Sequence, residues 1–152
     1  MDYDGKMDNE CVALCDALNN LPGVATFESC CGHCKRPYSI WFKTKDPYSM
    51  AVLARVVDRR YLPTKQLWDI TLETCEVRSD TMFCFRLSSE EAYADDSEMQ
   101  SDVDIVIENI KYWSGEEFKE HFGKKNVTCE GCINSTGCLT CVDHNQKQTL
   151  CF

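Results

Sequence analysis

Apolar residues recur along the chain with two different periods, which predict a mixture of helices and strands. Between residues 8 and 21 they recur every three or four positions, as in an amphipathic helix, and Pro22-Gly23 ends this run. The same period predicts a second helix from Asp46-Pro47, a third from residue 101 and a short one over residues 118–122. The apolar faces are Cys11, Leu14, Cys15, Leu18 and Leu21; then Met50, Leu53, Ala54, Val57 and Tyr61; then Val103, Val106, Ile107, Ile110 and Trp113.

Four other stretches are typical of strands: residues 24–29, 38–44, 66–76 and 81–89. The last two alternate apolar and polar positions on either side of a predicted turn at residues 77–80, so that Cys75 and Cys84 are expected to face each other. Residues 90–100 are acidic and lack a clear period, and we expect them to form a mobile or weakly helical link.

The order of these elements predicts an α+β domain over residues 1–122. We expect a mostly antiparallel four-stranded sheet with the helices on one face. Residues 123–152 form a cysteine-rich, metal-binding tail, expected to be a small zinc-knuckle appendage.

Composition narrows the class of protein. The 152 residues suffice for one domain with a substantial core, and no apolar run approaches the roughly 20 residues of a membrane helix. The polar, acidic N-terminus lacks the features of a secretory signal, so we expect a cytoplasmic protein with no membrane partner. In that reducing compartment the twelve cysteines are expected to be metal ligands, reactive groups or buried thiols rather than disulfides.

Charge is unevenly distributed over the chain. Residues 24–65 contain eight Lys or Arg and three Asp or Glu, a net charge of +5 in a chain of −9. Residues 66–122 contain four basic and fifteen acidic residues, a net charge of −11. The basic section favours an anionic ligand, whereas the acidic section is typical of a solvated face.

The tail carries the most specific chemical motif. Cys129-Glu-Gly-Cys132 and Cys138-Leu-Thr-Cys141 are two C-x-x-C units, and four thiolates at this spacing predict a structural Zn²⁺ site. An iron–sulfur cluster is the alternative occupant, since thiolates alone do not distinguish the two.

The loop over residues 29–36 is the other dense cluster. Three interpretations remain open: an anion-binding backbone turn at Gly32, a nucleophilic cysteine, or a plain turn with buried thiols. The first predicts a ligand-binding site made of Ser29, Cys30, Gly32, His33, Lys35 and Arg36.

Two segments resemble a group of small proteins of bacteriophages and their bacterial hosts. They are the stretch from Leu18 to His33, which contains an S-C-C-G-H motif, and the following Tyr38-Ser-Ile-Trp-Phe42. More distantly, Thr26 and then Ser29, Cys30 and Gly32 match the segment that leads into and forms the S-C-S-G-R loop of the methyltransferase family of tRNA wybutosine synthesis. That loop lies at the family's presumed active site, with S-adenosylmethionine as cofactor. This chain has Cys31 and His33 where that family has serine and arginine.

These patterns favour a phage-type binding protein that engages a nucleotide or RNA end, with a counter-defence role against a host defence protein implied by the resemblance. One alternative is an enzyme acting on RNA or a nucleotide, with Cys30 or His33 in the chemistry. Another is an acidic nucleic-acid mimic that inhibits a host enzyme. The sequence contains no Gly-rich cofactor loop, which favours binding over catalysis.

Overall fold

The computed structural model describes residues 7–77, 80–125, 140–141 and 149–150, and divides the chain into two compact units, Met1–Gly115 and Glu116–Phe152. The first unit holds a four-stranded sheet of order β1–β2–β4–β3 in which every neighbouring pair is antiparallel. The predicted α+β class and antiparallel sheet are therefore confirmed. The strands are β1 (Ala25–Cys30), β2 (Pro37–Lys43), β3 (Trp68–Val77) and β4 (Asp80–Ala92).

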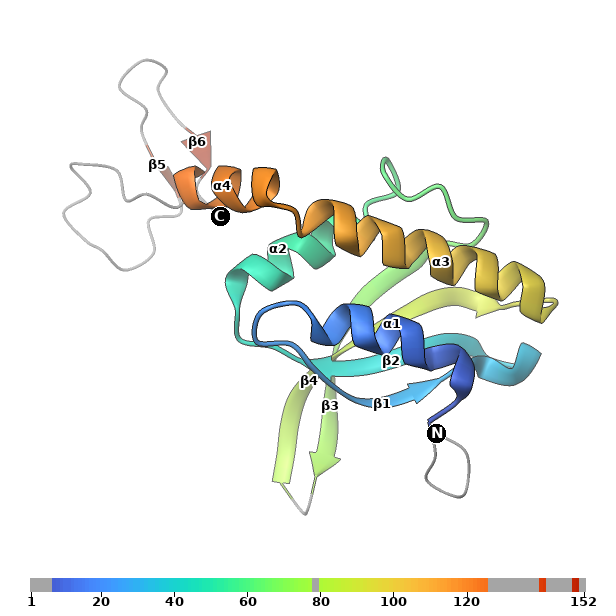
Figure 1. Cartoon of the computed structure of the whole chain (residues 1–152). Helices are drawn as coiled ribbons and strands as arrows, with labels where there is room; N and C mark the ends of the chain where they lie inside the picture. The colour runs from blue at the N-terminus through green and yellow to red at the C-terminus, as the bar shows by residue number, and fades with distance from the viewer. Residues whose placement is uncertain (1–6, 78–79, 126–139, 142–148, 151–152) are drawn as a thin grey trace. The chain divides into compact units, whose positions relative to one another are not determined.

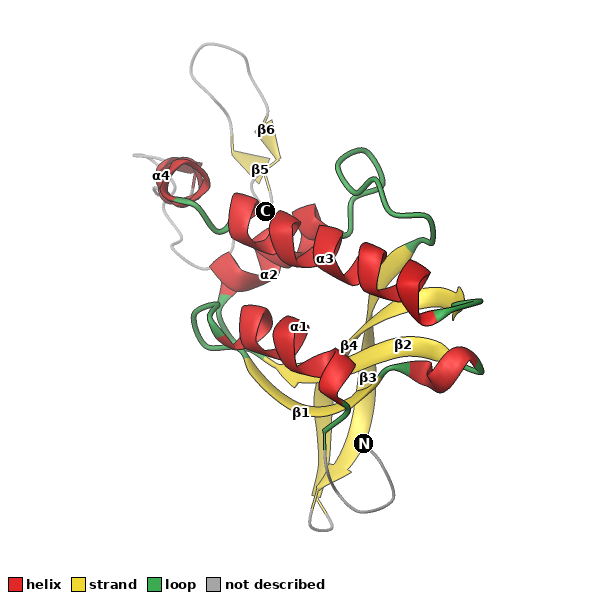
Figure 2. Cartoon of the chain, turned by 45° about the vertical axis from the view of Figure 1, so that its right-hand side comes forward, coloured by secondary structure: helices red, strands yellow, loops and turns green. Residues whose placement is uncertain are grey.

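The three α-helices described in the first unit lie on one face of this sheet (Figures 1 and 2). They are α1 (Asn9–Asn19), α2 (Pro47–Val56) and α3 (Asp96–Trp113), and α3 packs against both others. β2 lies between β1 and β4 and points Tyr38, Ile40 and Phe42 into the core, where all three are fully buried. This alternation fixes which face of the sheet the helices cover.

The predicted first helix is confirmed as α1, which ends at Asn19, and its buried residues Cys11, Leu14, Cys15 and Leu18 belong to the predicted stripe. Leu21 is also buried but lies beyond the helix. In α2 the helix is confirmed, but of its predicted face only Leu53 is buried. The other buried residues of α2 are Ser49, Val52 and Val56, which the prediction left out. The buried Ser49 hydroxyl has a hydrogen-bond partner, because it donates to the Pro22 carbonyl oxygen at 2.6 Å. α2 also ends at Val56, so Tyr61 lies beyond it.

The acidic stretch 90–100 is more regular than predicted. β4 continues to Ala92, and α3 starts at Asp96, where the Asp95 side chain accepts the backbone N–H of Glu98 at 2.8 Å. Acidic residues in a first helical turn are favourable because they face the positive end of the helix dipole. What looks like a link by composition is a strand end and a capped helix start.

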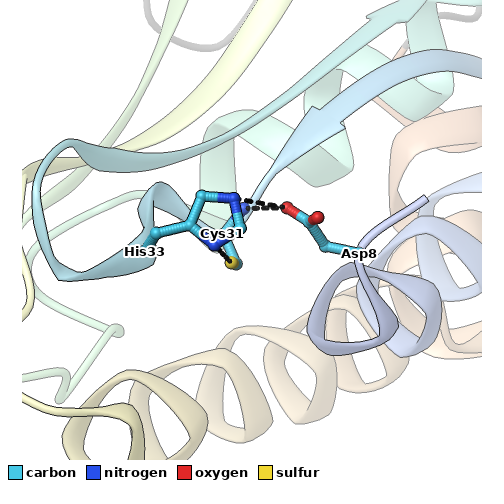
Figure 3. Close-up of side chains that lie close together, drawn as sticks. All are labelled: Asp8, Cys31 and His33. Atoms are coloured by element: carbon cyan, nitrogen blue, oxygen red, sulfur yellow. Dashed lines mark hydrogen bonds and ion pairs between the residues drawn. The ribbon is translucent and has the colours of Figure 1, made fainter. Parts of the chain in front are cut away.

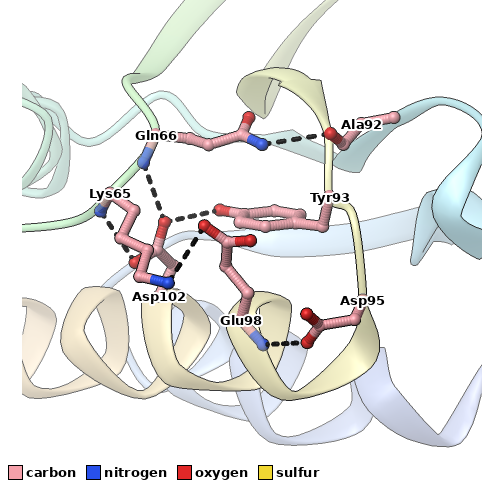
Figure 4. A network of polar contacts seen from close by, with 7 residues as sticks. All are labelled: Lys65, Gln66, Ala92, Tyr93, Asp95, Glu98 and Asp102. Atoms are coloured by element: carbon pink, nitrogen blue, oxygen red, sulfur yellow. Dashed lines mark hydrogen bonds and ion pairs between the residues drawn. The ribbon is translucent and has the colours of Figure 1, made fainter.

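A buried carboxylate on α3 fastens the loop before β3 (Figure 4). Asp102 accepts the backbone N–H groups of Lys65 and Gln66 at 2.9 and 3.0 Å. It also accepts the Tyr93 hydroxyl at 3.0 Å, and that hydroxyl accepts the Trp68 indole N–H. Burial next to this carboxylate raises the pKa of Tyr93, so the phenol remains a donor.

The β3–β4 hairpin has a different register from the one predicted. Cys84 pairs with Glu73, and Cys75 pairs with Met82, so the two cysteines are not directly opposite. The backbones of Val77 and Asp80 pair on either side of the turn. Leu72 and Phe83 are exposed, although they continue the apolar face of their strands.

The second unit contains α4 (Glu116–Lys125), which confirms a helix near residues 118–122, and a two-stranded antiparallel pair, β5 (Thr140–Cys141) and β6 (Thr149–Leu150). Cys129, Cys132 and Cys138 lie outside the described residues, and of Cys141 only the backbone is described. The zinc knuckle stays a prediction. Among the helices in the described part of the chain, none has the length and apolar character to cross a membrane.

Candidate functional site

The lengths of α1 and β1 bring the start of the helix next to the end of the strand. Eleven residues of helix span about 16 Å, and six residues of strand span about 20 Å. A strand that folds back beneath its helix therefore ends close to where the helix began. Asp8, immediately before α1, lies beside the turn that follows β1.

Asp8, Cys31 and His33 form a compact polar cluster (Figure 3). The Cys31 backbone N–H donates to Asp8 Oδ2 at 3.0 Å, and His33 Nε2 lies 3.7 Å from the same oxygen. On its other side the imidazole places Nδ1 3.4 Å from Cys31 Sγ. One ligating atom from each residue lies within 4.8 Å of the other two.

The backbone of the turn is held in an uncommon conformation. Gly32, His33 and Cys34 have φ angles of 79°, 49° and 56°, three consecutive residues in the left-handed region. Each non-glycine residue there costs about 1–2 kcal/mol. Glycine is favoured at position 32, because other residues are strained at its φ of 79° and a Cβ would approach the Pro37 carbonyl carbon and oxygen to 3.2 Å.

The pKa values of the Asp8 carboxyl and the Cys31 thiol are shifted in opposite directions. Burial opposes ionisation of the Asp8 carboxyl, but hydrogen bonds from Cys31 outweigh it and hold its pKa below the usual value. Burial raises the pKa of the Cys31 thiol to about 12, and the Asp8 charge adds to this effect. At neutral pH the carboxylate is therefore ionised and the thiol protonated.

The cluster contains a thiol (Cys31), an imidazole (His33) and a carboxylate (Asp8) in the order found in the active sites of cysteine nucleophiles. A nucleophilic cysteine, however, needs an accessible sulfur and a lowered pKa. Cys31 is 7 % exposed and its pKa is raised. In this conformation the cluster is better suited to holding a group than to attacking one.

The six predicted ligand-binding residues do not share one surface. Ser29 is buried, near the thiols of Cys11 and Cys15 beneath α1. Cys30 is half-buried, and its sulfur accepts the Gly32 backbone N–H at 3.4 Å. The side chains that reach solvent are those of His33, Lys35 and Arg36.

Of the cluster, only His33 is in the predicted ligand-binding set; Cys31 was left out of that set, and Asp8 was not considered as a site residue. It stands at the capping position of the first helix, where an aspartate needs no further explanation. In the structure its side chain makes no cap hydrogen bond to α1 and turns to the loop instead. The similar lengths of the helix and the strand could have indicated that Asp8 lies beside the turn after β1.

Comparisons with known protein families, characterised proteins and solved structures found no match for this chain. Its function is therefore inferred from the chemistry of its own side chains.

The turn also borders acidic residues at the start of α3. Cys34 is exposed, and its thiol donates to Asp96 Oδ1 at 3.4 Å. The Asp96 carboxylate raises the pKa of this thiol. A separate hollow on the β3–β4 hairpin is lined by Leu72, Glu73, Thr74 and Phe83 and contains none of the predicted binding residues.

Proposed function

We propose that the protein binds a ligand carrying a phosphate monoester, such as a nucleotide or a phosphorylated RNA end, at the loop of residues 29–36. The observation that carries this proposal is the turn held in left-handed conformation at Gly32, His33 and Cys34, in which His33 and Cys34 are exposed. Backbone strain of this kind gathers at binding sites, where the surrounding structure maintains it. In this turn the side chains of His33, Lys35 and Arg36 are exposed to solvent.

The two cations of the loop are available to a ligand. Within the described part of the chain, neither Lys35 nor Arg36 has a carboxylate at ion-pair distance, and both are exposed. A guanidinium matches the geometry of two phosphate oxygens, and an ammonium adds a point charge. The half-exposed His33 imidazole supplies a further polar group beside them.

Holding the ligand, rather than transforming it, is the role that the buried and protonated Cys31 thiol favours. A protein that binds a phosphate compound without turnover sequesters it. Sequestration is consistent with the counter-defence role implied by the resemblance to small phage proteins.

Fluorescence anisotropy tests this proposal with a short RNA oligonucleotide that carries either a 5′-phosphate or a 5′-hydroxyl. We expect tighter binding of the phosphorylated form, and competition by a nucleoside monophosphate if the phosphate alone is recognised. Each lost charged hydrogen bond is worth about 1.5–3 kcal/mol, so Lys35→Ala combined with Arg36→Ala should weaken binding at least tenfold.

The matched control is Lys45→Ala combined with Arg59→Ala, which removes two exposed positive charges outside the loop. Added salt should weaken binding by the wild type more than by the loop variant. Equal losses in the two double variants, or equal affinity for the 5′-phosphate and 5′-hydroxyl forms, would refute the proposal.

A further inference from the structure

We propose that Asp8, Cys31 and His33 bind a divalent transition-metal ion of the zinc class. The three side chains come from different parts of the fold: the residue before α1, the residue after β1, and the turn before β2. Convergence of a carboxylate, a thiol and an imidazole from two chain segments is specific, because no local sequence motif brings Asp8 to the other two.

The separations of the ligand atoms suit a small tetrahedral ion. Zinc–sulfur, zinc–nitrogen and zinc–oxygen bonds of about 2.0–2.3 Å give ligand-to-ligand distances of about 3.3–3.6 Å. The observed distances are 3.4 Å from Cys31 Sγ to His33 Nδ1 and 3.7 Å from His33 Nε2 to Asp8 Oδ2. These two distances end at different ring nitrogens, and only one of the nitrogens can bind the ion. Since the three ligand atoms lie within 4.8 Å of one another, closing the site around zinc requires shifts of up to about 1 Å.

The donor set selects the class of metal. Mg²⁺ and Ca²⁺ prefer oxygen ligands, whereas a thiolate with an imidazole favours Zn²⁺ and its neighbours among the transition metals. On binding, the Cys31 thiol gives its proton to solvent, and the thiolate enters the coordination sphere.

The charge at Asp8 supports a cation at this place. Its side chain is 3 % exposed, and among the described residues no Lys or Arg nitrogen lies within ion-pair distance of it. A buried carboxylate is costly without a compensating charge. The Cys31 backbone N–H, which donates to Asp8 Oδ2, would orient the carboxylate as an outer partner of the metal.

Three protein ligands leave one tetrahedral position open, which distinguishes this site from a closed structural one. His33 is 53 % exposed, so the open position has access to solvent. That position takes water, or a phosphate oxygen of the ligand, and the latter rests on the function proposed above. A metal ion there also removes the repulsion between Asp8 and a bound phosphate.

Isothermal titration of the metal-free, full-length chain with Zn²⁺ alone tests the site without any phosphate ligand. Asp8→Asn preserves an oxygen for the Cys31 N–H, Cys31→Ser removes the sulfur, and His33→Asn places a residue that tolerates left-handed backbone. Loss of an outer partner of a metal lowers affinity 10–100-fold, so each of these ligand substitutions should lower it by about 100-fold or more. Cys34→Ser, which changes the neighbouring exposed thiol, should leave the affinity unchanged.

Any metal held by the tail is common to all these variants and is counted separately by native mass spectrometry. Unchanged zinc number and affinity in folded Asp8→Asn and Cys31→Ser proteins would overturn the proposal. Should either variant fail to fold, X-ray absorption at the zinc edge of the wild type decides. A mixed sulfur, nitrogen and oxygen shell supports the site, and a shell of sulfur alone refutes it.

Discussion

The Asp8 carboxylate accepts the backbone N–H of Cys31 at 3.0 Å, although 23 residues separate the two along the chain. Aspartate at this position ordinarily accepts an N–H of its own helix. Here it makes no such bond to α1 and ties the start of the helix to the turn after β1. The fold thereby places a buried negative oxygen beside a thiol and an imidazole.

Asp102 should be among the residues most important for stability outside the site. The Asp102 carboxylate accepts from three donors: the N–H groups of Lys65 and Gln66 and the Tyr93 hydroxyl. Asp102→Asn replaces one of its acceptor oxygens by an NH2 group, so at least one of these donors loses its acceptor. We expect the free energy of unfolding to fall by about 1–3 kcal/mol, measured by urea denaturation. Asp104→Asn, an exposed change on the same helix, should stay within about 0.5 kcal/mol. Equal effects of the two would contradict the role of Asp102.

The described thiols should differ widely in reactivity, because burial separates them. Cys34 is exposed, whereas Cys11, Cys15, Cys31 and Cys84 are buried. Burial also raises the pKa of Cys11 to about 11, which leaves little thiolate at neutral pH. Brief alkylation followed by peptide mapping should therefore label Cys34 first, and Cys34→Ser should remove that label. Rapid labelling of Cys30 or Cys31 in the folded chain would show an accessible, reactive sulfur and would revive the nucleophile interpretation.

Local periodicity predicted the elements whose inner face is plainly apolar. α1 is of this kind, since its buried positions follow from spacing alone. The strands β3 and β4 were also predicted, but Leu72 and Phe83 are exposed although they continue the apolar faces of these strands. The face of α2 could not be predicted, because a buried Ser49 replaces an apolar residue and its hydroxyl is satisfied by the Pro22 carbonyl of a distant loop. The start of α3 was missed because its caps and buried contacts use acidic residues, Asp95 and Asp102.

The candidate site was predicted in part for a similar reason. Cys31, Gly32 and His33 are neighbours, so their sequence alone marks the turn as chemically dense. The partner that completes the cluster, Asp8, depends on how far α1 and β1 extend in space. The burial of Ser29 likewise depends on α1 lying over β1, which spacing within the loop does not reveal.

The four tail cysteines give a prediction that is independent of the folded unit. Cys132→Ser should lower the zinc content of the purified chain by about one equivalent, because three thiolates hold zinc less firmly than four. The first unit should keep its unfolding transition. Elemental analysis and thermal unfolding measure the two effects. A brown protein that contains iron in place of zinc would instead identify an iron–sulfur cluster.

The affinity for a 5′-phosphorylated RNA oligonucleotide, measured with Zn²⁺ and after chelation, tests the central claim most directly. The wild type should bind the oligonucleotide more tightly with zinc, by roughly 5–150-fold for a coupling free energy of 1–3 kcal/mol between the two ligands. Asp8→Asn retains the tail but should lose this zinc dependence. The same affinity in the wild type with and without zinc would contradict a metal-assisted phosphate site at Asp8, Cys31 and His33.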